Sequence, residues 1–281
     1  GIALGIALAV DAISDPLIGS LSDRFRSRFG RRHPMMLFAI VPTAVSFILL
    51  YSPPEDYSQT GYFIWLTFFT VAVRTSITFY NVPHLALGAE IAKDYEQRSS
   101  LFAFHTVISG IGGAGLGVAV YWIIFPTTGA FNPGTLNPDG YIVFGVAAAV
   151  IMSVSMLATV LGTSGEIAHL SDPAPREKAS ILDLASEMSE VFKDRDFLAI
   201  FLGFLLWYLF GFIEMVGMPF MALHFWGLRT EDLAYLQALN LIALLLAFSL
   251  IPIATRVLDK KRTLVFSSLI VIVLPNILIC S

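Results

Sequence analysis

The sequence begins GIALGIALAV DAISDPLIGS LSDRFRSRFG RRHP (residues 1–34), an apolar run followed by five arginines. A span across a hydrocarbon core of about 30 Å takes about 20 predominantly apolar residues, which this run supplies. The whole chain has the same character, with 56% apolar and only 14% charged residues, against about 25% charged in a soluble domain. We therefore expect an all-α polytopic membrane protein. The composition excludes a nucleic-acid binder, and the single cysteine excludes an internal disulfide.

Eight apolar segments are long enough, or nearly long enough, to cross a bilayer. They cover residues 1–22, 35–51, 62–89, 101–125, 141–163, 197–225, 233–254 and 264–281. The loops on one side of this alternating topology are 23–34, 90–100, 164–196 and 255–263, and they hold 15 of the 17 Lys and Arg. By the positive-inside rule these loops are cytoplasmic. We expect the plasma membrane as location, which is the inner membrane if the source is a bacterium.

The chain divides into three parts. We expect an N-terminal bundle over 1–163, a cytoplasmic central loop over 164–196 and the start of a C-terminal bundle over 197–281. Apolar residues between Ile181 and Phe192 recur at helical spacing, which predicts an amphipathic helix in the loop, either on the membrane surface or against a partner. Because the last apolar run lacks a flanking charge, we expect a piece of a larger protein.

Two carboxylates lie in the middle of the first span. Counted from its inner edge, Asp15 is about 12 Å and Asp11 about 18 Å inside the membrane. Their i, i+4 spacing puts them on one helix face beside Ser14, and Pro16 leaves the carbonyl of Ala12 without its helical hydrogen bond. Two like charges in a bilayer are costly, and a bound Na⁺ or H⁺ relieves that cost. Alternatively, both aspartates only pair with basic groups of helices that are missing from this piece.

The third span carries a matching polar face. Arg74, Thr78 and Asn81 recur at i, i+4 and i+7, and Asn81 is expected at about the depth of Asp11. Pro83 is expected to bend or unwind the helix at Asn81, as in many transport sites, or only to shape its packing.

Two further charges lie within spans. We expect Arg74 nearer the outer surface, as a gate, a substrate contact or the ion-pair partner of an acid such as Glu214. Glu214 itself is a candidate substrate contact or a structural ion-pair member. The run Gly110 to Gly115 matches G-x-G-x-x-G inside an apolar span, which predicts close helix packing rather than dinucleotide binding.

The run from Asp11 to Gly19, the loop Gly30-Arg31-Arg32-His33-Pro34 and the stretch Thr78 to Pro83 resemble one transporter family. They are similar to helix II, the II–III loop and helix IV of the glycoside–pentoside–hexuronide:cation symporters, the melibiose-carrier-like proteins of the major facilitator superfamily. On that register the chain covers about helices II–IX of twelve, a partial bundle. The resemblance implies a coupling-cation site at Asp11 and Asp15, the carboxylates for Na⁺ if sodium is the ion, with an oxygen from Thr78.

The same resemblance implies a cytoplasmic gate at Asp23, Arg24, Arg31 and Arg32. It also shows departures. Asn81 stands where sugar carriers tend to have an acid, and Leu85 and Thr106 replace an aromatic platform and an arginine. The candidate substrate-binding residues are therefore Asn81, Arg74, Leu85, Thr106 and Glu214.

We accordingly expect a cation-coupled secondary symporter that works by alternating access, as a monomer when complete, with no cofactor beyond Na⁺ or H⁺. The substrate is a small organic solute, either a sugar or glycoside or a lipid-like or other non-sugar solute. A non-transporting receptor is the alternative. An enzyme is not expected, because both aspartates share one helix and neither G-x-S-x-G nor H-E-x-x-H occurs.

Overall fold

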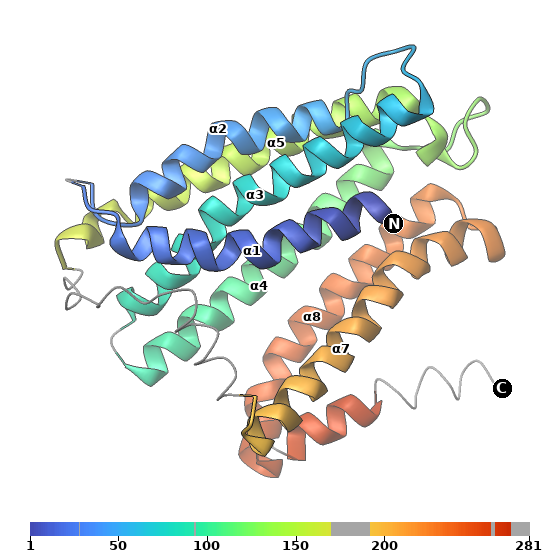
Figure 1. Ribbon diagram of the computed structural model, residues 1–281. Helices are drawn as coiled ribbons and strands as arrows, with labels where there is room; N and C mark the ends of the chain where they lie inside the picture. Colours follow the sequence, from blue (N-terminus) through green and yellow to red (C-terminus); the bar gives the residue numbers. More distant parts are fainter. Residues whose placement is uncertain (28, 93, 170–191, 260–261, 271–281) are drawn as a thin grey trace.

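A computed structural model describes residues 1–27, 29–92, 94–169, 192–259 and 262–270. Long helices dominate these residues, and no strand occurs in them (Figure 1). The long helices are α1 (Ile2–Arg24), α2 (His33–Leu50), α3 (Gln59–Ile91), α4 (Tyr95–Ala119), α5 (Pro138–Gly162), α7 (Arg195–Phe220) and α8 (Thr230–Leu258). Short helical segments join or extend them, namely η1 (Val120–Ile124), η2 (Gly134–Leu136), η3 (Ser164–His169) and η4 (Met221–Phe225).

Seven helices in this part of the chain are long and apolar enough to cross a membrane. They confirm seven of the eight predicted spans. Of the eighth, residues 262–270 are helical and the rest lies outside the described residues. The amphipathic helix predicted between Ile181 and Phe192 lies almost entirely outside them too.

Polar caps mark where several helices begin. The side chains of Ser58, Asp94 and Asp194 each accept a hydrogen bond from a backbone N–H in the first turn of the helix that follows, at 2.7–3.1 Å. Such caps satisfy N–H groups that have no partner within the helix. These starts lie in the polar loops that separate the apolar runs, two to six residues before the spans predicted from 62, 101 and 197.

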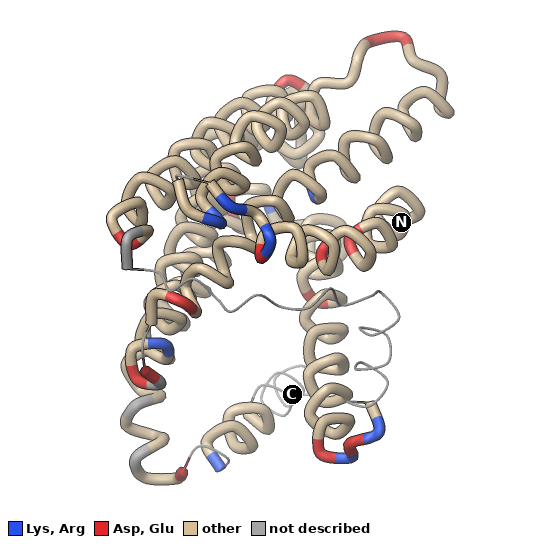
Figure 2. The backbone as a smooth tube through the Cα atoms, turned by 60° about the vertical axis from the view of Figure 1, so that its left-hand side comes forward, with Lys and Arg blue, Asp and Glu red and all other residues tan. Residues whose placement is uncertain are grey.

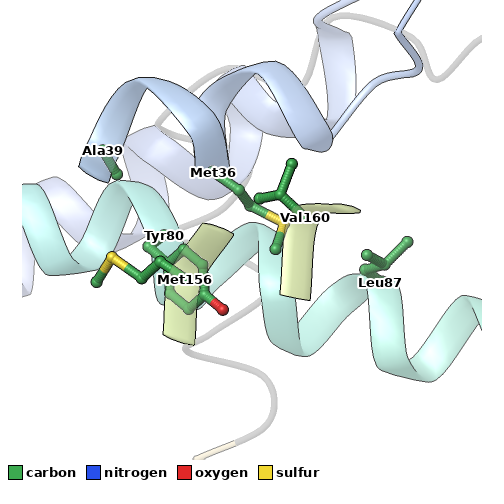
Figure 3. Packing of buried hydrophobic residues seen from close by; sticks show 6 residues of the cluster. All are labelled: Met36, Ala39, Tyr80, Leu87, Met156 and Val160. Carbon is green, nitrogen blue, oxygen red and sulfur yellow. The ribbon is translucent and has the colours of Figure 1, made fainter. Parts of the chain in front are cut away.

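In the N-terminal bundle α2 packs on α3 and α5, and α3 packs in turn on α1. Its buried centre joins residues from three helices (Figure 3), namely Met36 and Ala39 of α2, Tyr80 and Leu87 of α3, and Met156 and Val160 of α5. On its other side α3 lies close to α1, where a Cβ added at Gly19 would sit 3.6 Å from Val82 Cγ1. These contacts fix the faces that α1 and α3 present to each other.

The helix α3 runs without interruption through Asn81 and Pro83. The prediction that Pro83 unwinds the helix at Asn81 is therefore wrong. Pro83 is among the most deeply buried side chains. A proline removes one backbone hydrogen bond, and dense packing around its ring holds the helix together at that point. Its role here is the alternative one, to shape packing.

The main contact between the N-terminal bundle and the α7–α8 pair runs along α4 and α8. A Cβ added at Gly110 would lie 2.1 Å from Leu244 Cδ2, and one at Gly117 would lie 3.0 Å from Gln237 Cγ. The two glycines are seven residues apart on α4, and their partners are seven residues apart on α8 in the reverse order, as expected for one face of two antiparallel helices. Within the run Gly110 to Gly115 the predicted close packing is confirmed at Gly110 alone, because Gly112, Gly113 and Gly115 have no neighbouring atom of the described residues within 4 Å of an added Cβ.

Hydrogen bonds continue this contact at the outer end. Glu231 of α8 accepts hydrogen bonds from the backbone N–H and the hydroxyl of Thr127, both at 2.7 Å, and the hydroxyl of Thr230 accepts one from the N–H of Gly134 at 2.8 Å. Gly134 has no room for a side chain, because a Cβ would lie 2.2 Å from the carbonyl oxygen of Phe125. From this contact the two groups of helices diverge toward their inner ends (Figure 1).

Charge is distributed unevenly along the helices (Figure 2). Lys and Arg gather near the α1–α2 turn and the starts of α4 and α7, whereas the α2–α3 loop carries Glu55 and Asp56 but no basic residue. This arrangement agrees with the predicted orientation, in which the basic ends are cytoplasmic.

Candidate cation and substrate site

A cavity of about 400 Å³ is lined, among the described residues, by side chains of α1 and α3. Its wall consists of Asp11, Asp15, Arg74, Ile77, Thr78, Asn81, Val82 and Leu85. The polar faces predicted on the first and third spans thus meet in one place. The three charged members, Asp11, Asp15 and Arg74, are called the central cluster below.

Asp11 forms an ion pair with Arg74. The carboxyl oxygen Oδ2 lies 2.5 Å from the guanidinium Nε, and the side chain of Asp11 is 13% exposed against 37% for Arg74. The pairing of Arg74 with an acid such as Glu214, one of the alternatives given above, is therefore wrong, because its partner is Asp11. Depth counted along a helix axis ignores both the tilt of the helix and the length of an arginine side chain, which can bring its charge more than a helical turn away from its Cα.

The other carboxyl oxygens of the cluster lack partners. Oδ1 of Asp11 is buried and has no hydrogen-bond partner among the described residues. Asp15 is exposed on the cavity wall, and no hydrogen bond or ion pair of its carboxylate occurs in the described ranges. Two carboxylates thus face one guanidinium, so with all three groups ionised the central cluster carries one excess negative charge. A buried acceptor without a partner is costly, and one cation satisfies both the charge and the free oxygen.

The two predicted hydroxyl ligands differ in position. Thr78 is buried on the cavity wall, and its hydroxyl donates to the carbonyl of Arg74 at 3.1 Å, which leaves lone pairs for a cation. Ser14 is not on the wall, and its hydroxyl lies 3.5 Å from the carbonyl oxygen of Asp11. The structure therefore brings Thr78, but not Ser14, to the candidate ion site.

The predicted substrate residues divide in the same way. Asn81 and Leu85 lie on the cavity wall beside Arg74. Thr106 does not line it, and its hydroxyl donates to the carbonyl of Phe102 within α4 at 2.9 Å. Glu214 is exposed on α7, which does not pack on α1 or α3 in the described part of the chain. The sequence placed Thr106 and Glu214 in membrane spans, but it gave no information on whether their sides of those spans face the cavity.

A second group of charges lies at the inner ends of α1, α2 and α3. Arg31 donates to Glu90 at 2.6 Å, and Arg32 pairs with both Glu90 and Asp23, the latter at 3.1 Å. Arg32 is 6% exposed and also donates to the buried hydroxyl of Ser22 at 3.3 Å. We call Asp23, Arg31, Arg32 and Glu90 the inner cluster.

Three of the four predicted gate residues thus belong to the inner cluster, and Arg24 does not. Arg24 is exposed, and no ion pair of its side chain occurs among the described residues. Glu90 was missed, because loop 90–100 was considered only for its basic residues. The signal was present: two adjacent arginines need two carboxylates, and Asp23 supplies one.

Comparison with known proteins agrees with these observations. The family described as MFS/sugar transport protein matches residues 1–280. The inner membrane symporter YicJ of Escherichia coli is 40% identical over 108 residues, which are 38% of this chain and 23% of that protein. The sodium-dependent lysophosphatidylcholine symporter 1 of Gallus gallus is 31% identical over 120 residues, 42% of this chain and 22% of that protein.

A lactose permease of Leuconostoc lactis is 24% identical over 183 residues, 63% of this chain and 28% of that protein. The matched segments therefore span between about a fifth and a third of these relatives. The family is one of transport proteins rather than enzymes, and the seven apolar helices make the chain a multi-pass protein of the plasma membrane. The chain belongs to the MFS/sugar transport protein family.

Proposed function

We propose that the complete protein is a symporter in which Na⁺ or H⁺ binds at the central cluster and promotes binding of a small organic solute in the same cavity. The observation that carries this proposal is the excess negative charge: Asp11 and Asp15 face only one guanidinium in a cavity of about 400 Å³. Carboxylate and hydroxyl oxygens are hard ligands that suit Na⁺. A carboxylate is equally suited to bind a proton.

The ion and the solute are coupled because they bind in the same cavity. The solute-facing residues Asn81 and Leu85 line the same wall as the two carboxylates. An ion that neutralises Asp15 changes the charge that a solute meets, so ion and solute affect each other's affinity by the same factor. No direct contact between ion and solute is required.

The arrangement of the helices supports alternating access. The outer ends of the two helix groups are joined by the Thr127–Glu231 and Gly134–Thr230 hydrogen bonds, while the inner ends diverge (Figure 1). We propose that this arrangement is the inward-facing state. In the outward-facing state these outer hydrogen bonds are broken. We propose the monomer as the working unit.

The substrate class is narrowed by the cavity wall. Ile77, Val82 and Leu85 add apolar surface to the charged wall, and no aromatic ring lines it in the described part of the chain. We propose a solute with one polar and one apolar face, such as a glycoside. The name of the family favours a sugar, whereas the avian relative named as a lysophosphatidylcholine symporter favours a lipid-like solute.

Uptake into proteoliposomes that contain the complete protein tests the proposal. We expect an inward Na⁺ or H⁺ gradient to drive accumulation of a glycoside or a lysophospholipid, and Asp15→Asn to abolish accumulation. The matched control is Asp139→Asn, which removes an exposed acid in the first turn of α5, outside the cavity. Saturable binding without accumulation would favour a receptor, and accumulation that Asp15→Asn leaves intact would refute the proposed ion site.

A further inference from the structure

The contact between Arg74 and Asp11 is an ion pair inside the very site where the coupling ion is proposed to bind. Only one pair of atoms makes it, Nε and Oδ2, at 2.5 Å. An arginine that is fixed in place usually engages both carboxylate oxygens in parallel. Here Oδ1 of Asp11 has no partner among the described residues, so the pair uses half of the bonding capacity of the carboxylate.

Arg74 also has space to move. Its side chain is 37% exposed, and it lies on the wall of the cavity together with Asp15. An ion that approaches from the cavity meets Asp15 first, because Asp15 is exposed and Asp11 is buried behind its ion pair.

We infer that Arg74 is a tethered cation that competes with the coupling ion for Asp11, and that Asp15 is the carboxylate on which an arriving ion first binds. This inference rests on the proposed function. In the ion-free state Arg74 neutralises Asp11 and leaves Asp15 free. Binding of the ion between the two carboxylates requires Arg74 to release Oδ2. Arg74 thus weakens ion binding and keeps the ion exchangeable.

The inference predicts that removal of the positive charge strengthens ion binding. Two opposite charges at contact distance near a protein surface interact by several kcal/mol. Solvent around the half-exposed arginine reduces this value. We expect the half-saturating Na⁺ concentration to fall by at least about tenfold in Arg74→Gln, which corresponds to about 1.4 kcal/mol.

The experiment uses the purified complete protein. Thermal stability and tryptophan fluorescence are followed while NaCl replaces choline chloride at constant ionic strength, and a titration from neutral to acid pH repeats the measurement for H⁺. Arg74→Met is the second variant, because it removes the charge but keeps the volume of the stem. Arg74→Lys is the matched control and is expected to stay within about threefold of the parent protein, since it keeps a positive charge.

Lower half-saturating concentrations in Arg74→Gln or Arg74→Met, with little change in Arg74→Lys, support the inference. Unchanged or higher concentrations overturn it, and so does a failure of both charge-free variants to fold, because the pair is then a permanent structural one. Asp15→Asn separates this result from failure of the proposed function. If it loses the ion response, the ion site stands whatever Arg74 does. If it responds as the parent does, or if no version responds to either ion, the ion site and the inference both fail.

Discussion

The inner cluster and the central cluster both contain residues of the two long helices α1 and α3. The inner cluster also contains two arginines that directly precede α2. The two clusters differ in the balance of their charges. In the inner cluster two arginines face two carboxylates, and all four side chains take part in ion pairs. In the central cluster one arginine faces two carboxylates, and Asp11 Oδ1 lacks a partner among the described residues. Only the central cluster lines a cavity of about 400 Å³ that α1 and α3 enclose.

This difference indicates different roles. A balanced set of paired charges holds helix ends together, because no further ion is needed to satisfy it. An unbalanced set beside an open cavity has both the charge and the space for an exchangeable cation. The position of charged residues in a membrane segment is therefore a weaker indicator of function than the number of partners that each charge has.

The largest effect is expected at the inner cluster. Arg32→Ala leaves Glu90, Asp23 and Ser22 without their shared donor. Breaking a fully buried pair costs about 3–5 kcal/mol. Because the two acids are partly exposed, we expect a loss of about 2–3 kcal/mol in unfolding free energy. Thermal denaturation of the purified complete protein measures it.

The control for this prediction is Arg24→Ala, which removes an exposed arginine outside the inner cluster. Its cost is expected within about 0.5 kcal/mol. Equal losses in both variants would show that the ion pairs of the inner cluster contribute nothing specific to stability.

At the central cluster we expect smaller changes in unfolding free energy, which differ between the two aspartates. Asp11→Asn removes the partner of Arg74, and because that arginine is 37% exposed we expect a loss of only about 1–2 kcal/mol. Asp15→Asn removes a carboxylate that has no partner in the described part of the chain, so stability is expected to change by less than about 0.5 kcal/mol.

The same denaturation assay, run without Na⁺, compares the two aspartates. If Asp15→Asn destabilises as much as Asp11→Asn, Asp15 has a structural partner and the central cluster is not one charge in excess. That result would remove the distinction between the two clusters.

The smallest effect concerns the outer hydrogen bonds, which join two helix groups rather than the helices of one bundle. The double variant Thr127→Val with Glu231→Gln removes the hydroxyl contact and replaces the charged acceptor of the Thr127 N–H by a neutral one. For these part-buried hydrogen bonds we expect a shift of about 1 kcal/mol toward the open outer end, a factor of about five in population.

Labelling of Asn81→Cys from the outside, by a membrane-impermeant thiol reagent in a Cys280→Ser background, measures that opening. Thr128→Val is the control, since the hydroxyl of Thr128 accepts a hydrogen bond from Phe131 within its own loop. Equal labelling in the double variant and the control would show that the outer hydrogen bonds do not keep the outer end of the cavity closed.

The membrane spans were predictable because the requirement for about 20 apolar residues acts on each segment separately. The shared face of Asp11 and Asp15 was predictable for a similar reason, since helical periodicity alone places them. Both meet Thr78 and Asn81 on one cavity wall, as predicted.

Relations between helices were less predictable. The Asp11–Arg74 pair depends on how α1 and α3 cross. The positions of Thr106 and Glu214 depend on how α4 and α7 are rotated about their axes. The spacing of residues along one helix contains neither kind of information. Pro83 did not unwind α3, because tertiary packing outweighed a local preference. Glu90 was missed because its significance comes from the arginines of another segment.

The most direct test of the excess charge at the central cluster is infrared difference spectroscopy of the complete protein, which detects protonation of a carboxyl group and ion binding to a carboxylate alike. Spectra are recorded on addition of Na⁺ and on acidification. Our account predicts a carboxyl or carboxylate difference band in the parent protein that disappears in Asp15→Asn and persists in Asp139→Asn. A band that is unchanged in Asp15→Asn, or the absence of any such band under both conditions, would contradict it.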